Sequence, residues 1–254
     1  MLVMKFGGAS VANSESFHKI ADLIIERTKQ HPEIAVVISA MGNTTDQLLH
    51  LARQVHANPP RREQDMLVSV GERISISLLA MALSLKGKEA VSFTGSQSGI
   101  ITCENHTEAK IVDVRPHRLL PVLKKGQIAI VAGFQGVSRQ GEITTLGRGG
   151  SDTSAVALAI ALGATQVEFY KDVPGIFATD PKKDPAAPHF PTLSFEKALE
   201  LANQGAKVLH SRSIALAAKN GVQLSIRSFQ NPEMKGTVVG TASRTEKRYE
   251  VEGC

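Results

Sequence analysis

Short runs of consecutive apolar, often β-branched residues constrain the fold of this chain more than any other feature of its sequence. The clearest runs are E-I-A-V-V-I-S-A, which begins at Glu33, and the segment 127–132. A strand that is apolar on both faces is typical of a buried parallel sheet. Segments 2–6 and 166–171 are also strand-like, and helical patterns separate all of these segments. The sequence therefore predicts an α/β fold in which helices cover both faces of a mainly parallel sheet.

Apolar residues at helical spacing lie between these strands. Phe17, Ile20 and Ile24 recur in this way, and Ser14 stands where an N-cap is expected. The predicted helices cover about 14–30, 44–56, 62–85 (interrupted by Gly71), 119–124, 151–161, 194–204 and 210–220. Further strands are predicted at 90–94, 223–228 and 236–239, long loops at 133–150 and 174–191, and a frayed tail after Thr241. A lobe boundary is expected at 163–166, next to Gly163.

Composition argues against several classes of protein. The net charge of +5 is mild, and the chain has two Tyr and no Trp, so a nucleic-acid-binding surface is not expected. Cys103 and Cys254 form no disulfide framework, and Lys5 with the glycines after it interrupts any signal-peptide core. The longest apolar stretch, 155–162, is too short to span a bilayer. We therefore expect a cytoplasmic protein that binds neither nucleic acid nor a membrane.

Glycine clusters follow several of the predicted strands. They are Gly7-Gly8, Gly42, Gly133 with Gly136, and Gly147 with Gly149-Gly150. Ligands of an open parallel sheet bind at the carboxyl ends of its strands, where bare backbone N–H groups can accept a polyanion. Any one cluster alone is better explained as a tight turn. Because Lys5, Arg148, Ser151 and Asp152 lie among the clusters, the set together favours a phosphate site.

The usual fingerprints of nucleotide and metal sites are missing from the sequence. There is no G-x-x-x-x-G-K-[ST] loop, and no G-x-G-x-x-G joins a first strand to a helix. There is also no zinc-type spacing and no G-x-S-x-G elbow. If the chain binds a nucleotide, it therefore uses another architecture.

Six motifs resemble, in this order, the catalytic domain of the aspartokinases, which are members of the amino acid kinase superfamily. The motifs are K-F-G-G-A-S-V-A-N from Lys5, V-I-S-A-M-G-N-T-T-D from Val37, V-G-E-R from Val70, T-L-G-R-G-G-S-D from Thr145, K-D-V-P-G-I-F-A-T-D-P from Lys171 and A-N-Q-G-A-K-V-L-H from Ala202. The resemblance covers residues 2–239.

The resemblance implies a three-layer αβα sandwich and transfer of phosphate from ATP to L-aspartate with Mg²⁺, giving 4-phospho-L-aspartate. That reaction is the first step toward lysine, threonine, methionine and diaminopimelate. An N-terminal lobe, residues 1–165, would bind aspartate, and a C-terminal lobe, residues 166–254, would bind ATP. We expect one kinase domain over 1–254 with no ACT domain, hence no feedback inhibition by lysine or threonine, and a possible homodimer.

The resemblance also assigns catalytic roles. Phosphoryl transfer needs positioning and charge stabilisation, because the attacking carboxylate and the γ-phosphate are both anionic. Lys5 would contact the transferred group, Lys207 would approach it from the nucleotide side, and Asp152 would hold the lysines in place. Gly7, Gly8 and Ser10 would bring donors to the phosphates. Each has a simpler reading as a strand end, helix cap or surface residue.

The aspartate site implied by the resemblance pairs each charge of the substrate with a side chain. Arg148 would grip the α-carboxylate with its planar fork, and Glu72 would pair with the ammonium. The remaining members of the expected substrate site are Ser39, Thr45, Phe134, Gly149 and Ser151.

The ATP loop is where this chain departs from the family pattern. Its expected members are Lys171, Asp172, Gly175, Phe177, Asp180, Pro181 and Lys182. The family more often has Thr in place of Lys171, Asp in place of Pro174 and Arg in place of Lys182, and it has H-P-R where this chain has a serine at position 211. Lysine lacks the fork of arginine, so the phosphate contact at position 182 is expected to be weaker.

Three alternatives remain open at this point. The chain could phosphorylate another carboxylate, such as glutamate or N-acetylglutamate, or it could be a ligand-binding module without activity. A nucleoside monophosphate kinase of the same superfamily is a third. Glu72 argues against an N-acetylated substrate, which has no ammonium, and retention of Lys5 and Asp152 argues against an inactive module.

Overall fold

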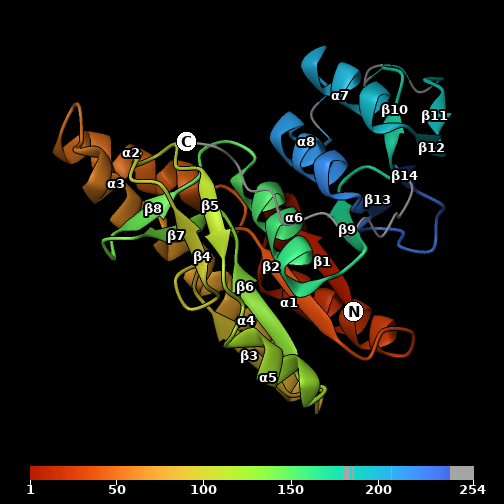
Figure 1. Cartoon of the computed structure of the whole chain (residues 1–254), viewed down its shortest axis with the longest axis horizontal. Coiled ribbons are helices and arrows are strands. Elements are labelled where there is room, and N and C mark those ends of the chain that lie inside the picture. Colours follow the sequence, from red (N-terminus) through yellow and green to blue (C-terminus); the bar gives the residue numbers. More distant parts are fainter. Residues whose placement is uncertain (180–183, 185, 207, 241–254) are drawn as a thin grey trace.

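An eight-stranded sheet forms the centre of the molecule (Figure 1). The computed structural model describes residues 1–179, 184, 186–206 and 208–240. The strands of this sheet are β1 (Leu2–Phe6), β2 (Ile34–Ile38), β3 (Ala90–Phe93), β6 (Ile128–Ala132), β9 (Gln166–Lys171), β12 (Thr192–Leu193), β13 (Gln223–Ser228) and β14 (Thr237–Val239). Their order is β12-β14-β13-β9-β1-β2-β6-β3, and every neighbouring pair is parallel except β13 and β14. The prediction of a mainly parallel sheet is confirmed.

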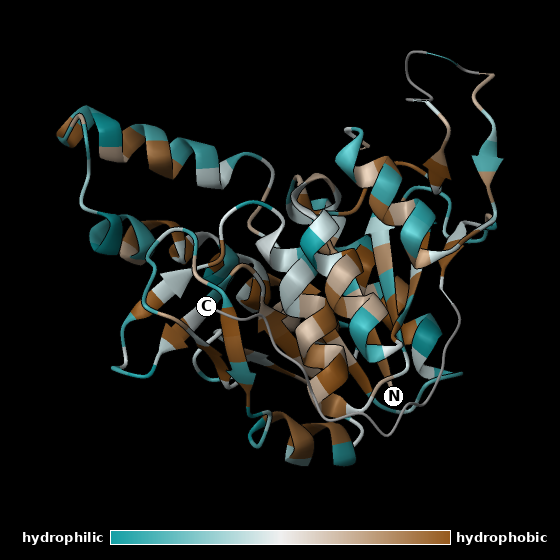
Figure 2. Cartoon of the chain, turned by 45° about the horizontal axis from the view of Figure 1, so that its top comes forward, coloured by the Kyte–Doolittle hydropathy of each residue, from teal (hydrophilic) through white to brown (hydrophobic). Residues whose placement is uncertain are grey.

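Helices cover both faces of this sheet, which gives the expected αβα sandwich. On one face, α1 (Ser14–Thr28) and α4 (Val70–Leu85) bury their apolar sides against Leu2, Met4 and Phe6. On the other face lie α5 (Leu119–Lys124), α6 (Gly150–Leu162), α7 (Phe195–Asn203) and α8 (Ser211–Asn220). Because side chains alternate along a strand, Val3 packs on this second face. Apolar residues gather in the strands and in the helices that lie on them (Figure 2).

A second, four-stranded sheet was missing from the sequence prediction. Its order is β5 (Ile111–Val114), β4 (Ile100–Thr102), β7 (Gln135–Ser138) and β8 (Ile143–Thr145). The segment 133–150, predicted as a loop, therefore contains the antiparallel pair β7–β8. The strands of this sheet are only three or four residues long, so their periodicity is too brief to be recognised. A further short pair joins β10 (Ile176–Phe177) to β11 (His189–Phe190).

Several helix boundaries differ from those predicted. The helix expected over 62–85 is two helices, α3 (Arg61–Val68) and α4, and the break falls at Ser69 rather than at Gly71. A Cβ on Gly71 would lie 2.8 Å from Cβ of Ala40, so this glycine is required for close packing. Ser14 is not the N-cap of α1; the Oδ1 atom of Asn13 accepts a hydrogen bond from the Ser16 N–H instead.

The segment Arg61–Leu85 is, by length and composition alone, apolar enough to cross a membrane, because its most apolar window of 18 residues has a mean hydropathy of 1.6. Half of its most apolar window is buried inside the fold, where Ile76, Leu79 and Leu83 join the core. This packing is that of a core helix.

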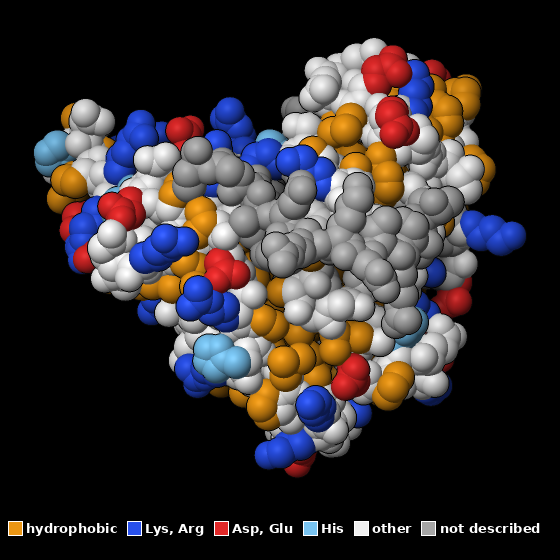
Figure 3. Space-filling view, in the orientation of Figure 1, with side chains coloured by type: hydrophobic (Ala, Val, Ile, Leu, Met, Phe, Trp, Pro, Cys, Tyr) orange, Lys and Arg blue, Asp and Glu red, His pale blue; other side chains and the backbone are white. Residues whose placement is uncertain are grey.

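The fold places a notch above the carboxyl ends of the central strands. Helices α2 (Thr44–Val55) and α3 project on one side, and α7 and α8 project on the other (Figure 1). In the space-filling view, Lys and Arg side chains gather along the rim of this notch (Figure 3). Strand β1 lies between β2 and β9, so the strands that follow β1 in the sequence are first added on its β2 side and later on its β9 side. Ligands of open α/β sheets bind at such a switch point.

Candidate active site

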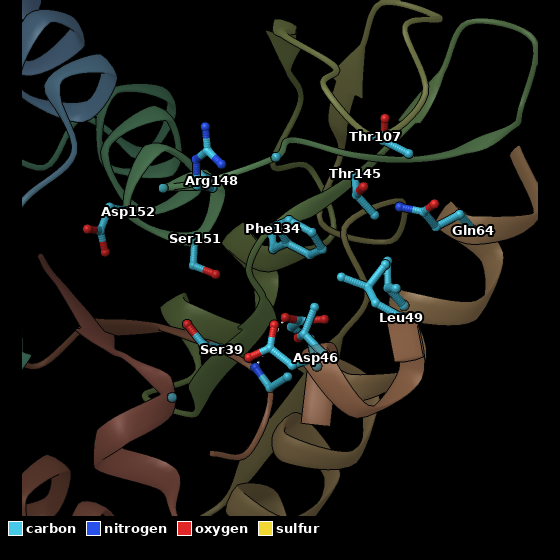
Figure 4. A pocket seen from close by; sticks show the side chains of 18 of the residues that line it. Ser39, Asp46, Leu49, Gln64, Thr107, Phe134, Thr145, Arg148, Ser151 and Asp152 are labelled. Atoms are coloured by element: carbon cyan, nitrogen blue, oxygen red, sulfur yellow. Dashed lines mark hydrogen bonds between the residues drawn. The ribbon is translucent and has the colours of Figure 1, made fainter. Parts of the chain in front are cut away.

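A cavity of about 470 Å³ opens at the carboxyl edge of β1, β2 and β6 (Figure 4). Helices α2, α3 and α6 and the loop after β8 complete its walls. The lining residues are Lys5, Gly8, Ser39, Ala40, Gly42, Thr45, Asp46, Leu49, Gln64, Val68, Glu72, Thr107, Phe134, Thr145, Gly147, Arg148, Gly149, Gly150, Ser151 and Asp152. A cavity of this size suits a small polar metabolite or part of a nucleotide.

The turns after β1 and β2 pack directly against each other at the floor of the cavity. The Gly42 N–H donates to the Gly8 carbonyl at 3.2 Å, and the Ser39 N–H donates to the Phe6 carbonyl at 3.1 Å. A Cβ on Gly8 would stand 3.1 Å from the Gly42 oxygen. Gly8 is therefore explained by this close approach of two backbones. A Cβ on Gly7, in contrast, would stand 3.4 Å from Nζ of Lys5 and would fill the space beside the ammonium.

Two lysines share one buried carboxylate at the edge of the cavity. Nζ of Lys5 lies 2.6 Å from Oδ1 of Asp152, and Nζ of Lys171 lies 3.0 Å from Oδ2. Lys5 and Asp152 are buried, and Lys171 is half-buried. Lys5 is the next-to-last residue of β1, Lys171 ends β9 and Asp152 lies in the first turn of α6, so three elements meet at this cluster.

The cluster carries a net positive charge because two lysines share a single ionised carboxylate. Burial alone would raise the pKa of Asp152, but the charges of Lys171 and Lys5 and their hydrogen bonds outweigh it and lower that pKa to about 2. Burial lowers the pKa of Lys5 to about 8, with Asp152 opposing and Lys171 assisting. At neutral pH the site thus presents two ammonium groups held by one carboxylate, an arrangement that attracts an anion.

Glu72 adds a buried carboxylate to the lining of the cavity. It lies in the first turn of α4, is buried, and its Oε1 accepts a hydrogen bond from the Ala40 N–H at 3.1 Å. Its Oε2 has no hydrogen-bond partner among the described residues. Burial raises the pKa of Glu72 to about 7, while the hydrogen bonds from its own and the Ala40 backbone lower it. A buried carboxylate oxygen without a partner is costly, so this atom fits a cationic ligand.

Arg148 stands on a glycine loop that the C-terminal half of the chain holds in place. Gly149 adopts φ +73°, and a Cβ there would stand 2.2 Å from Cγ of His210. Arg212, which follows His210 by two residues, donates a hydrogen bond from its guanidinium to the Leu146 carbonyl at 2.7 Å. Arg148 itself is exposed at the cavity rim and has no carboxylate partner among the described residues, which leaves its fork available for an anion.

Phe134 forms the middle of the cavity wall, between Ser151 and Leu49 (Figure 4). It has φ +68°, which is unusual for an aromatic residue. Its N–H donates to Oγ of Ser154 and its carbonyl accepts from the Leu146 N–H, so α6 and the loop after β8 hold this conformation.

The structure brings half of the twenty predicted site residues together in one cavity. Ten of them line the cavity: Lys5, Gly8, Ser39, Thr45, Glu72, Phe134, Arg148, Gly149, Ser151 and Asp152. The predicted support of Lys5 by Asp152 matches the observed ion pair, although the second lysine seen on this carboxylate is Lys171. Lys207, Asp180, Pro181 and Lys182 lie outside the described residues.

Other predicted residues lie away from the cavity lining. Ser10 is buried, and its hydroxyl donates to the Tyr170 carbonyl at 3.2 Å, so it holds β9 to the turn after β1. Gly175 is buried, and a Cβ there would stand 2.5 Å from Thr237 Oγ1. Phe177 packs on His189, with ring centroids 5.0 Å apart, and Asp172 is exposed after β9.

Sequence reasoning missed part of the lining. The missed residues are Ala40, Asp46, Leu49, Gln64, Val68, Thr107 and Thr145, whereas Gly42, Gly147 and Gly150 belong to the glycine clusters that the sequence had singled out. Some of them belong to the quoted motifs, and the D-Q-L-L that follows Thr45 continues one motif along α2. Thr107 and Gln64 carry no local signal, because only the tertiary fold brings α3 and the loop after β4 to the cavity.

No group of three or more His, Cys, Asp or Glu side chains able to hold a metal ion occurs in the part of the chain that the structure describes. A metal that arrives with a phosphate ligand needs only one or two protein carboxylates. Asp152, beside the two lysines, is available for such a contact.

Comparison with known proteins identifies the family of the chain. Residues 1–228 match the sequence profile described as the amino acid kinase family. The chain is 52% identical over 240 residues to an aspartokinase of Mycolicibacterium smegmatis, which covers 94% of this chain and 57% of that protein. It is 48% identical over 253 residues to the aspartokinase of Geobacillus stearothermophilus, of which it covers 62%. The chain thus spans about three fifths of the length of these curated relatives.

Solved structures show the same likeness. Aspartate kinase from Synechocystis superposes with a TM-score of 0.85 at 45% identity, over 97% of this chain and 40% of that chain. E. coli aspartokinase III in complex with aspartate and ADP superposes with a TM-score of 0.86 at 28% identity, over 96% of this chain and 65% of that chain. From the profile match over residues 1–228 and the identity to these relatives, we conclude that this chain belongs to the amino acid kinase family.

Proposed function

We propose that this chain is an aspartate kinase catalytic domain, which transfers the γ-phosphoryl group of ATP to the side-chain carboxylate of L-aspartate. The products are ADP and 4-phospho-L-aspartate. One observation carries the proposal: a single cavity joins a buried two-lysine cluster to a buried carboxylate whose Oε2 is unpaired among the described residues. The first suits a phosphoryl group and the second an ammonium, so the cavity fits an amino acid that receives phosphate.

The substrate is oriented by its two backbone charges. Its ammonium pairs with Oε2 of Glu72, and its α-carboxylate is held by the guanidinium of Arg148. Ser39, Thr45 and Ser151 offer hydroxyl groups along the cavity, and the Phe134 ring excludes water from one wall. The side-chain carboxylate is then directed toward Lys5.

The transfer itself needs no general base. An aspartate side chain, with a pKa of about 3.9, is ionised at neutral pH and attacks directly. The carboxylate oxygen forms a bond to the γ-phosphorus, the bond to the bridging oxygen breaks, and ADP leaves with that electron pair. The ammonium of Lys5 neutralises charge on the transferred group. Asp152, whose pKa is about 2, keeps Lys5 and Lys171 in position and remains ionised.

ATP is assigned to the side of the cavity formed by Gly7, Lys171 and the segment after β9. The open space beside Gly7 and Lys5, which a Cβ would fill, suits a phosphate oxygen. Mg²⁺ bound with the nucleotide supplies further charge neutralisation, with Asp152 as its candidate protein contact. The relative from E. coli was solved with aspartate and ADP, and that pair of ligands supports the assignment.

This function places the chain in amino-acid biosynthesis, at the entry to lysine, threonine and methionine, and in the cytoplasm. We assign aspartate to residues 1–165 and ATP to residues 166–254, with one sheet running through both parts. A homodimer through the N-terminal part stays a prediction.

The test is to incubate the purified chain with Mg-ATP and one candidate acid, then trap the acyl phosphate with hydroxylamine. Aspartate is expected to give hydroxamate, and glutamate and N-acetylglutamate much less. Hydroxamate with glutamate but none with aspartate would replace the proposal by the glutamate alternative. ATP turnover with a nucleoside monophosphate, and with no acid, would replace it by the monophosphate kinase alternative.

A further inference from the structure

We propose that Asp65 is a positioning residue for the aspartate half of the cavity, a role that rests on the proposed function. Asp65 lies on α3, is fully buried, and does not itself line the cavity, whereas Gln64 and Val68 of the same helix do. It acts through two neighbouring segments: the loop 105–109 that follows β4, and the end of β8.

The Asp65 carboxylate accepts hydrogen bonds from both segments. Oδ1 accepts from the Thr145 hydroxyl at 2.5 Å, and both carboxylate oxygens lie 3.1 Å from the Thr107 N–H. Oδ2 also lies 2.7 Å from Nδ1 of His106. A buried carboxylate is retained only when such donors surround it. Asp65 therefore ties α3 to the loop and to β8 at one point.

The residues that Asp65 holds are themselves part of the cavity wall. Thr107 and Thr145 both line the cavity and stand close to Gln64 (Figure 4). Thr107 has φ +71°, in the left-handed region that a β-branched residue rarely adopts. Its N–H, bonded to Asp65, fixes the residue in this conformation. Thr107 and Phe134 are the two non-glycine residues with positive φ in the described chain, and both face this cavity.

The same contacts extend to the loop that carries Arg148. The Ala109 N–H donates to the Thr145 carbonyl at 2.9 Å, so the loop 105–109 and β8 are joined directly. A Cβ on Gly147 would stand only 3.1 Å from the Thr107 carbonyl, which shows how closely the two segments pack. Arg148 follows Gly147. Asp65 on one side, and Arg212 bonded to Leu146 on the other, therefore fix the stretch from which Arg148 reaches the substrate.

This arrangement predicts a specific kinetic effect. Without the Asp65 carboxylate, the cavity wall at Thr107 and Thr145 and the loop that carries Arg148 occupy the binding-competent arrangement for only a fraction of the time. The apparent affinity for aspartate is then reduced in proportion to that fraction. Aspartate binding should suffer, whereas ATP binding and the chemical step, which depend on the Lys5 cluster, should not.

The experiment compares Asp65→Asn with wild type and with Glu168→Gln as a matched control. Glu168 is also a buried carboxylate, bonded to Arg27 and Tyr170 on the sheet face that α1 covers. KM for aspartate, KM for ATP and kcat are measured, together with aspartate affinity by calorimetry without ATP and the thermal midpoint. Asp65→Asn should weaken aspartate binding about tenfold or more, with kcat and KM for ATP within about twofold of wild type. Glu168→Gln should lower the thermal midpoint and leave KM for aspartate unchanged.

The route through Thr145 has its own test. Thr145→Val removes the hydroxyl that Asp65 accepts from, and Thr145→Ser keeps it. Thr145→Val should raise KM for aspartate, Thr145→Ser should not, and the effects of Asp65→Asn and Thr145→Val should be clearly less than additive. If Asp65→Asn does not fold, the Val and Ser pair provides the same comparison.

Three results would overturn the inference. They are an unchanged aspartate affinity in Asp65→Asn, an equal loss in Glu168→Gln, and fully additive effects in the double variant. Failure of the proposed function is recognised separately, because wild type would then neither bind aspartate in the calorimeter nor form hydroxamate.

Discussion

Replacement of Glu72 by glutamine tests the assignment of the ammonium site most directly. Oε2 of Glu72 is buried and unpaired among the described residues, and burial raises the pKa of this carboxyl from 4.5 to about 7. By linkage, that rise corresponds to roughly 3 kcal/mol of preference for the protonated form in the folded state. An ammonium in contact with Oε2 reverses this preference, so aspartate should bind the ionised form.

The pH dependence follows with a definite sign. In the free enzyme, kcat/KM for aspartate should rise with pH through about 7. It should be about tenfold below its plateau at pH 6 and about 100-fold below it at pH 5, because the ionised fraction falls tenfold for each pH unit. In the complex the ammonium lowers the pKa of Glu72, so kcat should lack this limb. Stability changes in the opposite sense: the contribution of protonated Glu72 is complete below pH 4.5 and is lost as pH rises through about 7.

In Glu72→Gln, kcat/KM for aspartate should no longer rise with pH near 7, and aspartate binding should be weaker. Loss of one partner from a buried ion pair costs about 3–5 kcal/mol, which corresponds to a fall in kcat/KM between roughly 10²-fold and several thousandfold at pH 8. Steady-state kinetics between pH 5 and 9, with hydroxylamine trapping as the assay, gives both quantities. A limb near pH 7 that persists in Glu72→Gln, or an unchanged KM for aspartate, would refute the reasoning.

Three further predictions concern the phosphate side and the glycine loop. Because burial lowers the pKa of Lys5 to about 8, kcat/KM for ATP should fall as pH rises through that value. In Lys5→Arg this fall should occur at a higher pH. A fall at the same pH in both proteins would show that it does not arise from Lys5. Asp152→Asn leaves the buried Lys5 ammonium without its carboxylate and should lower kcat by about 100-fold or more, so wild-type kcat in this variant would show that Asp152 does not hold Lys5. Gly149→Ala should destabilise the fold by roughly 2 kcal/mol or more, because φ is +73° and the new Cβ would meet His210. Gly126→Ala, at φ +72° with open space around it, should destabilise the fold less. Equal thermal midpoints of the two variants would contradict the contact with His210.

Seven of the eight strands of the main sheet were predicted from the sequence, and the two-residue β12 was not. Residues 34–38 and 128–132 are buried along their whole length, as a parallel strand covered on both faces requires. Strand β8, three residues long, has no such run, and its pairing with β7 depends on contacts that a local pattern does not encode. The order of the strands likewise follows from packing rather than from any one segment.

The candidate site was predictable where charged residues adjoin glycines at strand ends. Lys5, Arg148 and Asp152 stand out in this way, and all three line the cavity. The ion pair of Lys171 with Asp152 was not predicted, and it forms because β9 lies beside β1 and ends at the same edge of the sheet; the role of Lys171 in binding ATP stays a prediction. Asp65 gave no signal, since a single acidic residue on an amphipathic helix reads as a surface charge until its burial is known.

The position of β1 in the sheet has a consequence for synthesis of the chain. Met4 and Lys5 pair with residues of β2 on one side and with Glu168 and Phe169 of β9 on the other. Until β9 has left the ribosome, one edge of β1 in the nascent chain has no neighbouring strand. The backbone of β1, including that of Lys5, is then unpaired along this edge. Closure of so long a loop is slow, and exposed edges promote aggregation, so productive folding of this domain should wait for the synthesis of β9 and should be sensitive to chaperone supply.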